Sequence, residues 1–193
     1  MAYTVVVDAN VLYDAAARDL LIRFAIRGSV RVRWTEHILD ECFHALRSNR
    51  PDLREDRLIR MRKLMCDAVP DCIIMGYEPL VEAIQVPDTG DRHVVAAAVK
   101  SDAQAIVTYN TRDFPNESIG QYHLEVIHPD DFFVNQIDLD PIAAVHVIRE
   151  LAEDLKVPPR TPAEIVAGLE ARGLAVIASR LRALLFEPGG GVK

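Results

Sequence analysis

The first 133 residues alternate between short apolar runs and longer segments in which apolar residues recur at helical spacing. Most of these runs are rich in β-branched residues and end at a polar residue, which is typical of buried strands. Strands that alternate with helices predict an α/β fold, in which helices cover both faces of a parallel sheet. The predicted strands are residues 4–7, 30–34, 72–75, 105–108 and 124–127.

The segments between these strands predict helices. Residues 11–27 form the first, and Thr35 is placed to cap the next one. Pro51 is expected at the start of a helix that continues to about residue 68, because proline favours the first helical turn. Residues 76–85 carry a weaker helical signal, and a turn at residues 87–91 leads into an amphipathic helix.

Beyond residue 133 the pattern is helical throughout. Asp140 precedes Pro141, and Thr161 precedes a proline and then Glu164, so both sites carry a capping residue followed by proline. We therefore predict an α/β domain at residues 1–133 and a helical extension at residues 134–193, with a frayed end at 188–193. The amphipathic helices of the extension must pack on the first domain, on one another or on a second chain.

The composition is that of a globular protein, with 50% hydrophobic and 26% charged residues. No apolar run approaches the roughly 20 residues that a membrane helix needs, so no membrane partner is expected. The first residues lack the basic segment of a secretory signal. The three cysteines include no CxxC pair, which favours the reducing cytoplasm and a role as buried apolar residues.

The charge is unevenly distributed along the chain. The net charge is −7, yet residues 1–63 hold 12 basic and 9 acidic side chains. Residues 47–63 alone carry seven basic and three acidic side chains, a density that suits contact with phosphates. The interleaved acids equally fit a solvated helix face. The candidate phosphate-contacting residues in this segment are Arg50, Arg54, Arg57 and Arg60.

Three carboxylates stand where a parallel α/β sheet places its ligand sites. Asp8 ends the first strand, Asp91 opens a helix, and Asp113 follows the fourth strand by a short turn. Glu41, on the border of a helix's apolar face, is a fourth candidate. Carboxylates gathered in this way repel one another unless a cation holds them. Oxygen ligands suit Mg²⁺ or Mn²⁺, which can activate water for phosphodiester hydrolysis.

Each of these acids also has an ordinary structural interpretation. Asp88 can cap a helix that has Asp91 at its third position, and the helix dipole favours both. Asp113 can be a turn residue and Glu41 a solvated helix charge. It is the joint placement of the four acids that favours a metal site.

Two other chemistries are compatible with parts of the sequence. His37, Glu41 and His44 share one helical face and could contribute to a zinc site, although no further ligand is evident. The run Asp8-Ala-Asn10 suggests a haloacid-dehalogenase-type phosphatase. That family has a second aspartate as general acid where this chain has Asn10, which disfavours this alternative.

Four motifs, in order, resemble those of PIN-domain nucleases. They span about residues 4–133, and the fourth is the most specific. Asp8, Glu41, Asp91 and Asp113 match the acidic quartet of the family, and Asn10, Asp88, Thr108 and Asn110 match its supporting polar positions. The motifs are VVVDANV at 5–11, TEHILDE at 35–41, PDTGDRHVVAAA at 87–98 and IVTYNTRDF at 106–114.

The resemblance implies a three-layer α/β/α fold with a parallel sheet of strand order 3-2-1-4-5. It further implies an acidic pocket that binds Mg²⁺ or Mn²⁺, with Asp8, Asp91 and Asp113 as ligands, and cleavage of single-stranded RNA. The resemblance is strongest to VapC-type toxins, which a cognate antitoxin neutralises, and a homodimer is expected. Asp88 adds an acid one helical turn from Asp91, and the extension at 134–193 exceeds a minimal toxin.

Two alternatives stay open at this stage. A housekeeping RNA-processing nuclease would carry the same motifs as a toxin, and only a neighbouring antitoxin gene would separate the two. A PIN-like module that binds RNA or protein without cutting is disfavoured by the complete acidic set.

Overall fold

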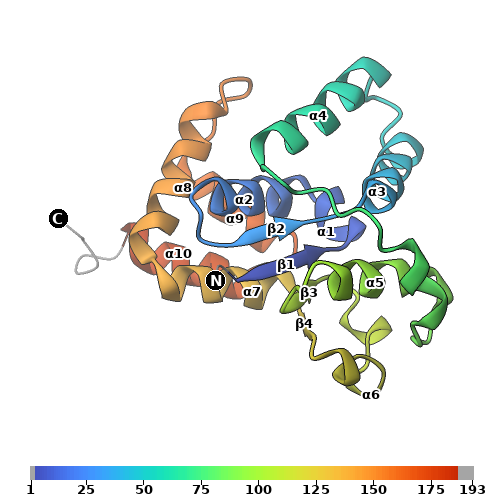
Figure 1. The fold of residues 1–193 in the computed structure, drawn as a ribbon. Helices are drawn as coiled ribbons and strands as arrows, with labels where there is room; N and C mark the ends of the chain where they lie inside the picture. Colours follow the sequence, from blue (N-terminus) through green and yellow to red (C-terminus); the bar gives the residue numbers. More distant parts are fainter. Residues whose placement is uncertain (1–2, 187–193) are drawn as a thin grey trace. The chain divides into compact units, whose positions relative to one another are not determined.

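A computed structural model describes residues 3–186 of the 193-residue chain, so the expected frayed end at 188–193 lies outside the described residues. The chain divides into two compact units, Met1–His128 and Pro129–Lys193 (Figure 1). The division falls between β4 (Glu125–Ile127) and α7 (Pro129–Leu139). The boundary that we predicted after residue 133 lies inside α7.

The first unit is built on a parallel sheet of four strands in the order β2-β1-β3-β4. β1 (Thr4–Val7) is central and entirely buried, and it pairs with β2 (Arg31–Arg33) and with β3 (Ala105–Val107). β3 in turn pairs with β4. The α/β class and the parallel sheet predicted from the sequence are confirmed.

The predicted strand at residues 72–75 is reduced to a single parallel bridge between Trp34 and Ile73. The bridge lies beyond β2, the place that the order 3-2-1-4-5 gives to the third strand. Asp71 and Gly76 adopt positive φ angles of 56° and 72° and turn the chain at both ends of the segment. Residues 72–75 therefore form only two backbone hydrogen bonds with Trp34. Trp34 N–H donates to Cys72 O, and Ile74 N–H donates to Trp34 O, each at 2.8 Å.

Helices complete the layers of this unit. α2 packs on β2, and α5 packs on β1 and β3, which gives the α/β/α arrangement expected for the fold. The helices of the unit are α1 (Ala9–Tyr13), α2 (Ala15–Ile26), α3 (Glu36–Asn49), α4 (Glu55–Ala68), α5 (Arg92–Lys100) and α6 (Asn116–Ile119).

Three predicted helices differ in detail. The helix predicted at 11–27 is broken by Asp14, which is extended and accepts a hydrogen bond from Ala16 N–H at the start of α2. Pro51 does not begin a helix: residues 51–53 turn, with Leu53 N–H on Arg50 O, and Arg54 is still extended before α4. The segment 76–85 holds only a six-residue 3₁₀ helix, Glu78–Ala83, because Gly76 and the extended Ile84 bound it closely.

The strand order creates a switch point at the middle of the sheet. The chain leaves β1 toward β2 on one side and leaves β3 toward β4 on the other. Open α/β sheets bind ligands at the carboxyl ends of the two strands that flank such a point. In this protein those ends are occupied by Asp8 and Thr108.

Up to residue 186, where the described part ends, the second unit has four helices, α7, α8 (Pro141–Asp154), α9 (Pro162–Glu170) and α10 (Ala175–Phe186), and α10 packs on the other three. Both predicted caps are confirmed. Asp140 accepts from Ala143 N–H, and Thr161 with Glu164 forms a capping box. Asp130 of α7 accepts from the first backbone amides of α10, Val176 at 2.9 Å and Ile177 at 2.8 Å. Among residues 3–186, no helix is both long and apolar enough to span a bilayer.

Candidate active site

Asp8 stands at the carboxyl end of β1, where the sheet, α1 and the end of β3 surround it. The residue is only 8% exposed. Oδ1 accepts a hydrogen bond of 2.6 Å from Ala9 N–H at the start of α1, so Asp8 also caps that helix. Oδ2 accepts from Asn10 Nδ2 and from Thr108 Oγ1, both at 2.7 Å. The carboxylate is fixed in orientation on both oxygens.

Thr108 and Asn10 form a closed polar network around this carboxylate. The Thr108 hydroxyl is fully buried; it donates to Asp8 and accepts from Asn10 Nδ2 at 2.9 Å and from Asn110 N–H at 3.0 Å. The remaining polar atom of the Asn10 side chain, Oδ1, accepts from Tyr109 N–H at 3.1 Å. Hydrogen bonds of these two side chains therefore connect the end of β1 to the turn that follows β3.

Two further acids lie near Asp8 at the ends of short helical turns. Asp91 ends the 3₁₀ turn Thr89–Asp91 and leads directly into α5, while Asp113 ends the 3₁₀ turn Thr111–Asp113 after β3. Both are half-buried. Asp88 is exposed and caps the first of these turns by accepting from Gly90 N–H at 2.8 Å. Asp91 makes no such capping bond, which leaves its carboxylate available to the site.

The electrostatics of Asp91 show that these acids share one space. Burial, followed by the negative charges of Asp8, Asp88 and Asp113, raises the pKa of Asp91 to about 6. Burial also raises the pKa of Asp8, against the hydrogen bonds from Thr108 and Ala9 that lower it. Carboxylates from three segments far apart in the sequence thus repel one another at one edge of the sheet.

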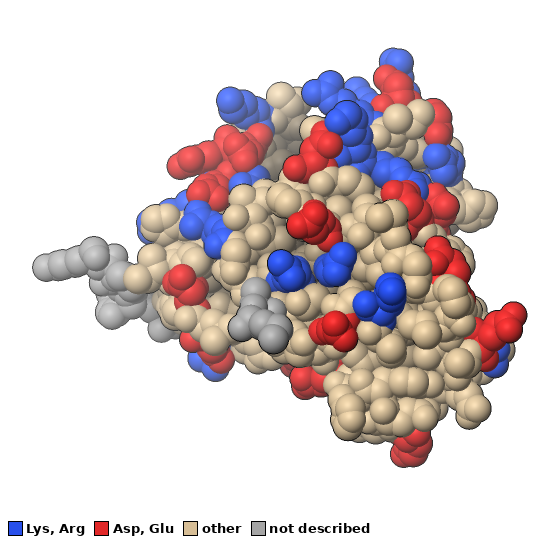
Figure 2. Space-filling view, viewed as in Figure 1, with Lys and Arg blue, Asp and Glu red and all other residues tan. Residues whose placement is uncertain are grey.

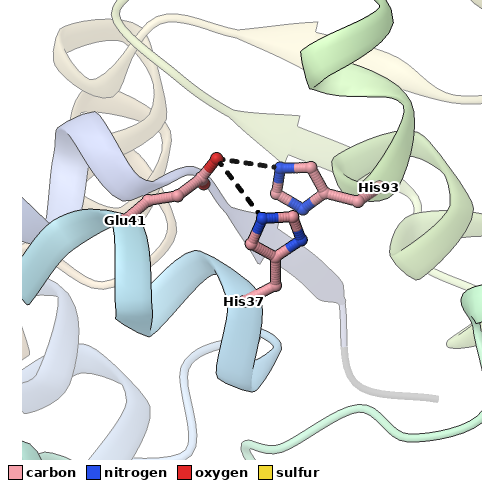
Figure 3. A group of neighbouring side chains, drawn as sticks. All are labelled: His37, Glu41 and His93. Atoms are coloured by element: carbon pink, nitrogen blue, oxygen red, sulfur yellow. Dashed lines mark ion pairs between the residues drawn. The ribbon is translucent and has the colours of Figure 1, made fainter. Parts of the chain in front are cut away.

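Glu41 approaches this group from α3 and makes its contacts with histidines. Its Oε1 lies 3.2 Å from His93 Nε2 and 3.8 Å from His37 Nε2 (Figure 3). The charges of Glu41 and His93 both act on Asp8, in opposite directions, so the pair borders the acidic group. His44, which shares a helical face with His37 and Glu41, is not part of this cluster, whose third member is His93.

The remaining predicted residues differ in what they contact. Asn110 joins the network through its backbone N–H. Arg50 forms an ion pair with Asp52 at 2.7 Å, and Arg54 forms one with Asp56 at 3.0 Å. Arg57 and Arg60 form no ion pair within residues 3–186, and they line a groove of about 360 Å³ between α2 and α4. Basic and acidic side chains intermingle over α3 and α4 (Figure 2).

His93 is the residue that sequence reasoning missed. It lies two positions after Asp91 in the third motif, and its side chain is 5% exposed. The signal in the sequence was a histidine that directly precedes the apolar residues of α5. Its partner Glu41, however, lies on α3, 52 positions away in the sequence. Helix periodicity instead suggested His44, which shares a helix with Glu41.

Comparisons with known proteins agree with this architecture. The family model described as PIN domain matches residues 4–112, and the model described as VapC50 C-terminal domain matches residues 129–183, within the second unit. Over 94 residues the chain is 38% identical to "Putative ribonuclease VapC50" of Mycobacterium tuberculosis. That alignment covers 49% of this chain and 55% of the relative, so the chain spans about half the length of the curated protein it matches.

No solved structure gives a significant match to the chain. The PIN domain match covers more than half of the 193 residues and includes the motifs that carry Asp8, Glu41 and Asp91. The strand order is the one that the resemblance implied, with the third strand reduced to the bridge at Ile73. The chain therefore belongs to the PIN-domain family.

Proposed function

We propose that this protein is a metal-dependent endoribonuclease that hydrolyses RNA phosphodiester bonds. The observation that carries the proposal is the gathering of acids around Asp91 at the switch point of the sheet, where burial and the charges of Asp8, Asp88 and Asp113 raise its pKa to about 6. Crowded carboxylates repel one another and destabilise the folded protein, and a cation that binds among them removes this repulsion.

The residues present fit Mg²⁺ or Mn²⁺. Asp8, Asp91 and Asp113 offer only carboxylate oxygens, the ligand type that these ions prefer. Asp8 Oδ1 accepts one hydrogen bond, from Ala9, so it retains acceptor capacity on the side away from Asn10 and Thr108. We assign the ion to these three acids, with Glu41 as the fourth acid of the catalytic quartet.

The chain's own groups have distinct tasks in this mechanism. When bound, the cation would supply charge neutralisation at the phosphodiester and activation of water. Thr108 and Asn10 hold the Asp8 carboxylate in one orientation, and Asn110 supports Thr108 through its backbone N–H. Asp88 adds negative charge beside Asp91 and fixes the turn that presents it. Arg57 and Arg60 are candidates to contact the phosphates of the RNA.

We assign the biological role as the toxin of a type II toxin–antitoxin system. Support comes from the name of the relative in Mycobacterium tuberculosis and from the match of residues 129–183 to the VapC50 C-terminal domain. In this proposal the protein acts in the cytoplasm, a cognate antitoxin neutralises it, and the second unit supplies a contact surface for the antitoxin or for a second copy in a homodimer. An adjacent antitoxin gene distinguishes this role from that of a housekeeping nuclease.

The test is cleavage of mixed RNA by purified protein with Mg²⁺, with Mn²⁺ and with EDTA. We expect cleavage with either ion, none with EDTA, and none by Asp8→Asn, which removes a charge but no core packing. Asp102→Asn is the matched control, because Asp102 is exposed and its positive φ of 50° suits asparagine. Wild-type cleavage by Asp8→Asn would refute the site, and RNA binding without cleavage would favour a non-catalytic module.

A further inference from the structure

We propose that His37, Glu41 and His93 form a second cation site, specific for a transition metal of the Zn²⁺ type. The three side chains offer two imidazole nitrogens and one carboxylate oxygen, which all lie within 4.8 Å of one another (Figure 3). Asp8, Asp91 and Asp113, the proposed ligands of Mg²⁺ or Mn²⁺, contribute no atom to this group. The two sites therefore differ in ligand chemistry.

The donor set selects the metal. Imidazole nitrogen suits Zn²⁺ and neighbouring transition metals, whereas Mg²⁺ takes oxygen ligands. Two histidines and a glutamate around an open position are a recurrent protein site for zinc. Zinc bonds of about 2.0–2.1 Å in tetrahedral geometry put ligand atoms roughly 3.3 Å apart. The 3.2 Å between Glu41 Oε1 and His93 Nε2 already meets this spacing.

The site combines one rigid and two adjustable ligands. The His93 side chain is buried in α5, and its Nδ1 has no hydrogen-bond partner among the described residues, so Nε2 makes its polar contact. His37 and Glu41 are one helical turn apart on α3, with side chains 52% and 41% exposed. The rings of His37 and His93 are stacked with centroids 4.0 Å apart. In this proposal the exposed His37 ring rotates on binding, which brings its Nε2, now 3.8 Å from Glu41 Oε1, closer to the tetrahedral spacing and tilts the two rings out of their stack.

Glu41 connects this site to the catalytic one. Its charge acts on Asp8, and the proposed function counts it in the acidic quartet. A Zn²⁺ ion held by His37 and His93 would keep Glu41 as its ligand and withdraw it from the acidic group. This consequence rests on the proposed function: with Mg²⁺ or Mn²⁺ present, added Zn²⁺ inhibits cleavage by the wild type and inhibits His37→Ala less.

The binding test does not depend on activity. Full-length protein without a polyhistidine tag is titrated with Zn²⁺ by calorimetry and with Co²⁺ by visible absorption, since Co²⁺ bound through nitrogen in four-coordinate geometry absorbs far more strongly than Co²⁺ in an octahedral oxygen site. We expect one equivalent of Zn²⁺ to bind and a strong Co²⁺ spectrum. His37→Ala should weaken Zn²⁺ binding by about tenfold or more and abolish that spectrum.

His44→Ala is the matched control, because His44 is an exposed histidine of the same helix outside the cluster. It should bind Zn²⁺ and Co²⁺ as the wild type does. Glu41→Gln provides a second variant at an exposed position, and it should also weaken Zn²⁺ binding. Unchanged affinity in His37→Ala, or equal losses in His37→Ala and His44→Ala, would overturn the proposal. A protein that binds Zn²⁺ as expected but cleaves no RNA would refute the nuclease assignment and leave this site standing.

Discussion

The buried hydroxyl of Thr108 shows how single residues organise the candidate site. It uses its one donor on Asp8 and accepts from Asn10 and Asn110. Nothing in this geometry requires Thr108 or Asn10 to touch a cation; both orient a carboxylate. Their contribution to catalysis should therefore be smaller than that of Asp8.

We expect Thr108→Val to lower RNA cleavage by about 10–100-fold, as is common when a supporting hydrogen bond to a metal ligand is lost. Asn10→Ala should behave similarly. Thr108→Ser, which keeps the hydroxyl, should retain most of the activity. Initial rates at saturating Mn²⁺ measure the effect, and a loss as complete as that of Asp8→Asn would place the altered side chain directly on the cation.

Asp91 should make the stability of the metal-free protein depend on pH. Its folded-state pKa of about 6 lies above the ordinary 3.8, so the folded protein binds the proton more tightly than the unfolded chain does. The stabilisation from the protonated form is fully present below about pH 4 and is lost as pH rises through about 6. In EDTA, Asp91→Asn should therefore have a higher melting temperature than the wild type at neutral pH and nearly the same one at pH 4.

Thermal unfolding followed by circular dichroism between about pH 4 and pH 7.5 measures this difference. Asp102→Asn serves as the control and should differ from the wild type by the same small amount at every pH. Adding Mn²⁺ should raise the melting temperature of the wild type more than that of Asp91→Asn. A constant offset between Asp91→Asn and the wild type across the range would show that Asp91 is not crowded by other charges.

Among the elements of the second unit, α10 depends on a cap that comes from another helix. Asp130 accepts hydrogen bonds from Val176 and Ile177 at the start of α10, and its side chain is buried. These two bonds satisfy amides that have no partner within the helix, and the negative charge opposes the positive end of the helix dipole.

We expect Asp130→Ala to lower the free energy of unfolding of the second unit by about 1–2 kcal/mol. Amide hydrogen exchange in α10, measured by mass spectrometry, should accelerate. Asp131→Ala is the matched control, because the neighbouring Asp131 is exposed and should change neither exchange nor stability by more than about 0.5 kcal/mol. Equal protection of α10 in both variants would show that its start is stable without the cap.

At the scale of the whole molecule, a net charge of −7 opposes binding to RNA, so any contact must depend on local basic side chains. The structure divides the four candidate arginines. Arg50 and Arg54 are paired with neighbouring aspartates, while Arg57 and Arg60 line the groove beside α2.

We expect Arg57→Glu with Arg60→Glu to weaken binding of single-stranded RNA and to reduce the slope of log affinity against log salt by about 1.4, the value for two phosphate contacts. Arg54→Glu is the control and should have a smaller effect, because Asp56 already neutralises Arg54. Fluorescence anisotropy at several salt concentrations with an uncleavable RNA measures both quantities. An unchanged salt slope in the double variant would identify this surface as merely solvated.

The sequence by itself determined the positions of four strands and of the helix caps at Asp140 and Thr161, and it suggested which acids form the site. β1 was predicted at its exact bounds, and the caps at Asp140 and Thr161 formed as expected, because β-branched runs and capping side chains act on backbone within a few residues of themselves. The convergence of Asp8, Asp91 and Asp113 followed from their places at strand ends and helix starts, since parallel strands bring such positions to one edge.

Only the tertiary structure decided which side chains meet across elements. Glu41 contacts His93 of α5 rather than sharing a ligand set with His44, because the approach of α3 to α5 depends on packing that no local pattern encodes. The strand at 72–75 shrank to one bridge because positive-φ residues at both ends turn the chain away from β2. The backbone conformation of a residue depends largely on its neighbours in the sequence, whereas contacts between side chains far apart in the sequence form only when the whole core has packed.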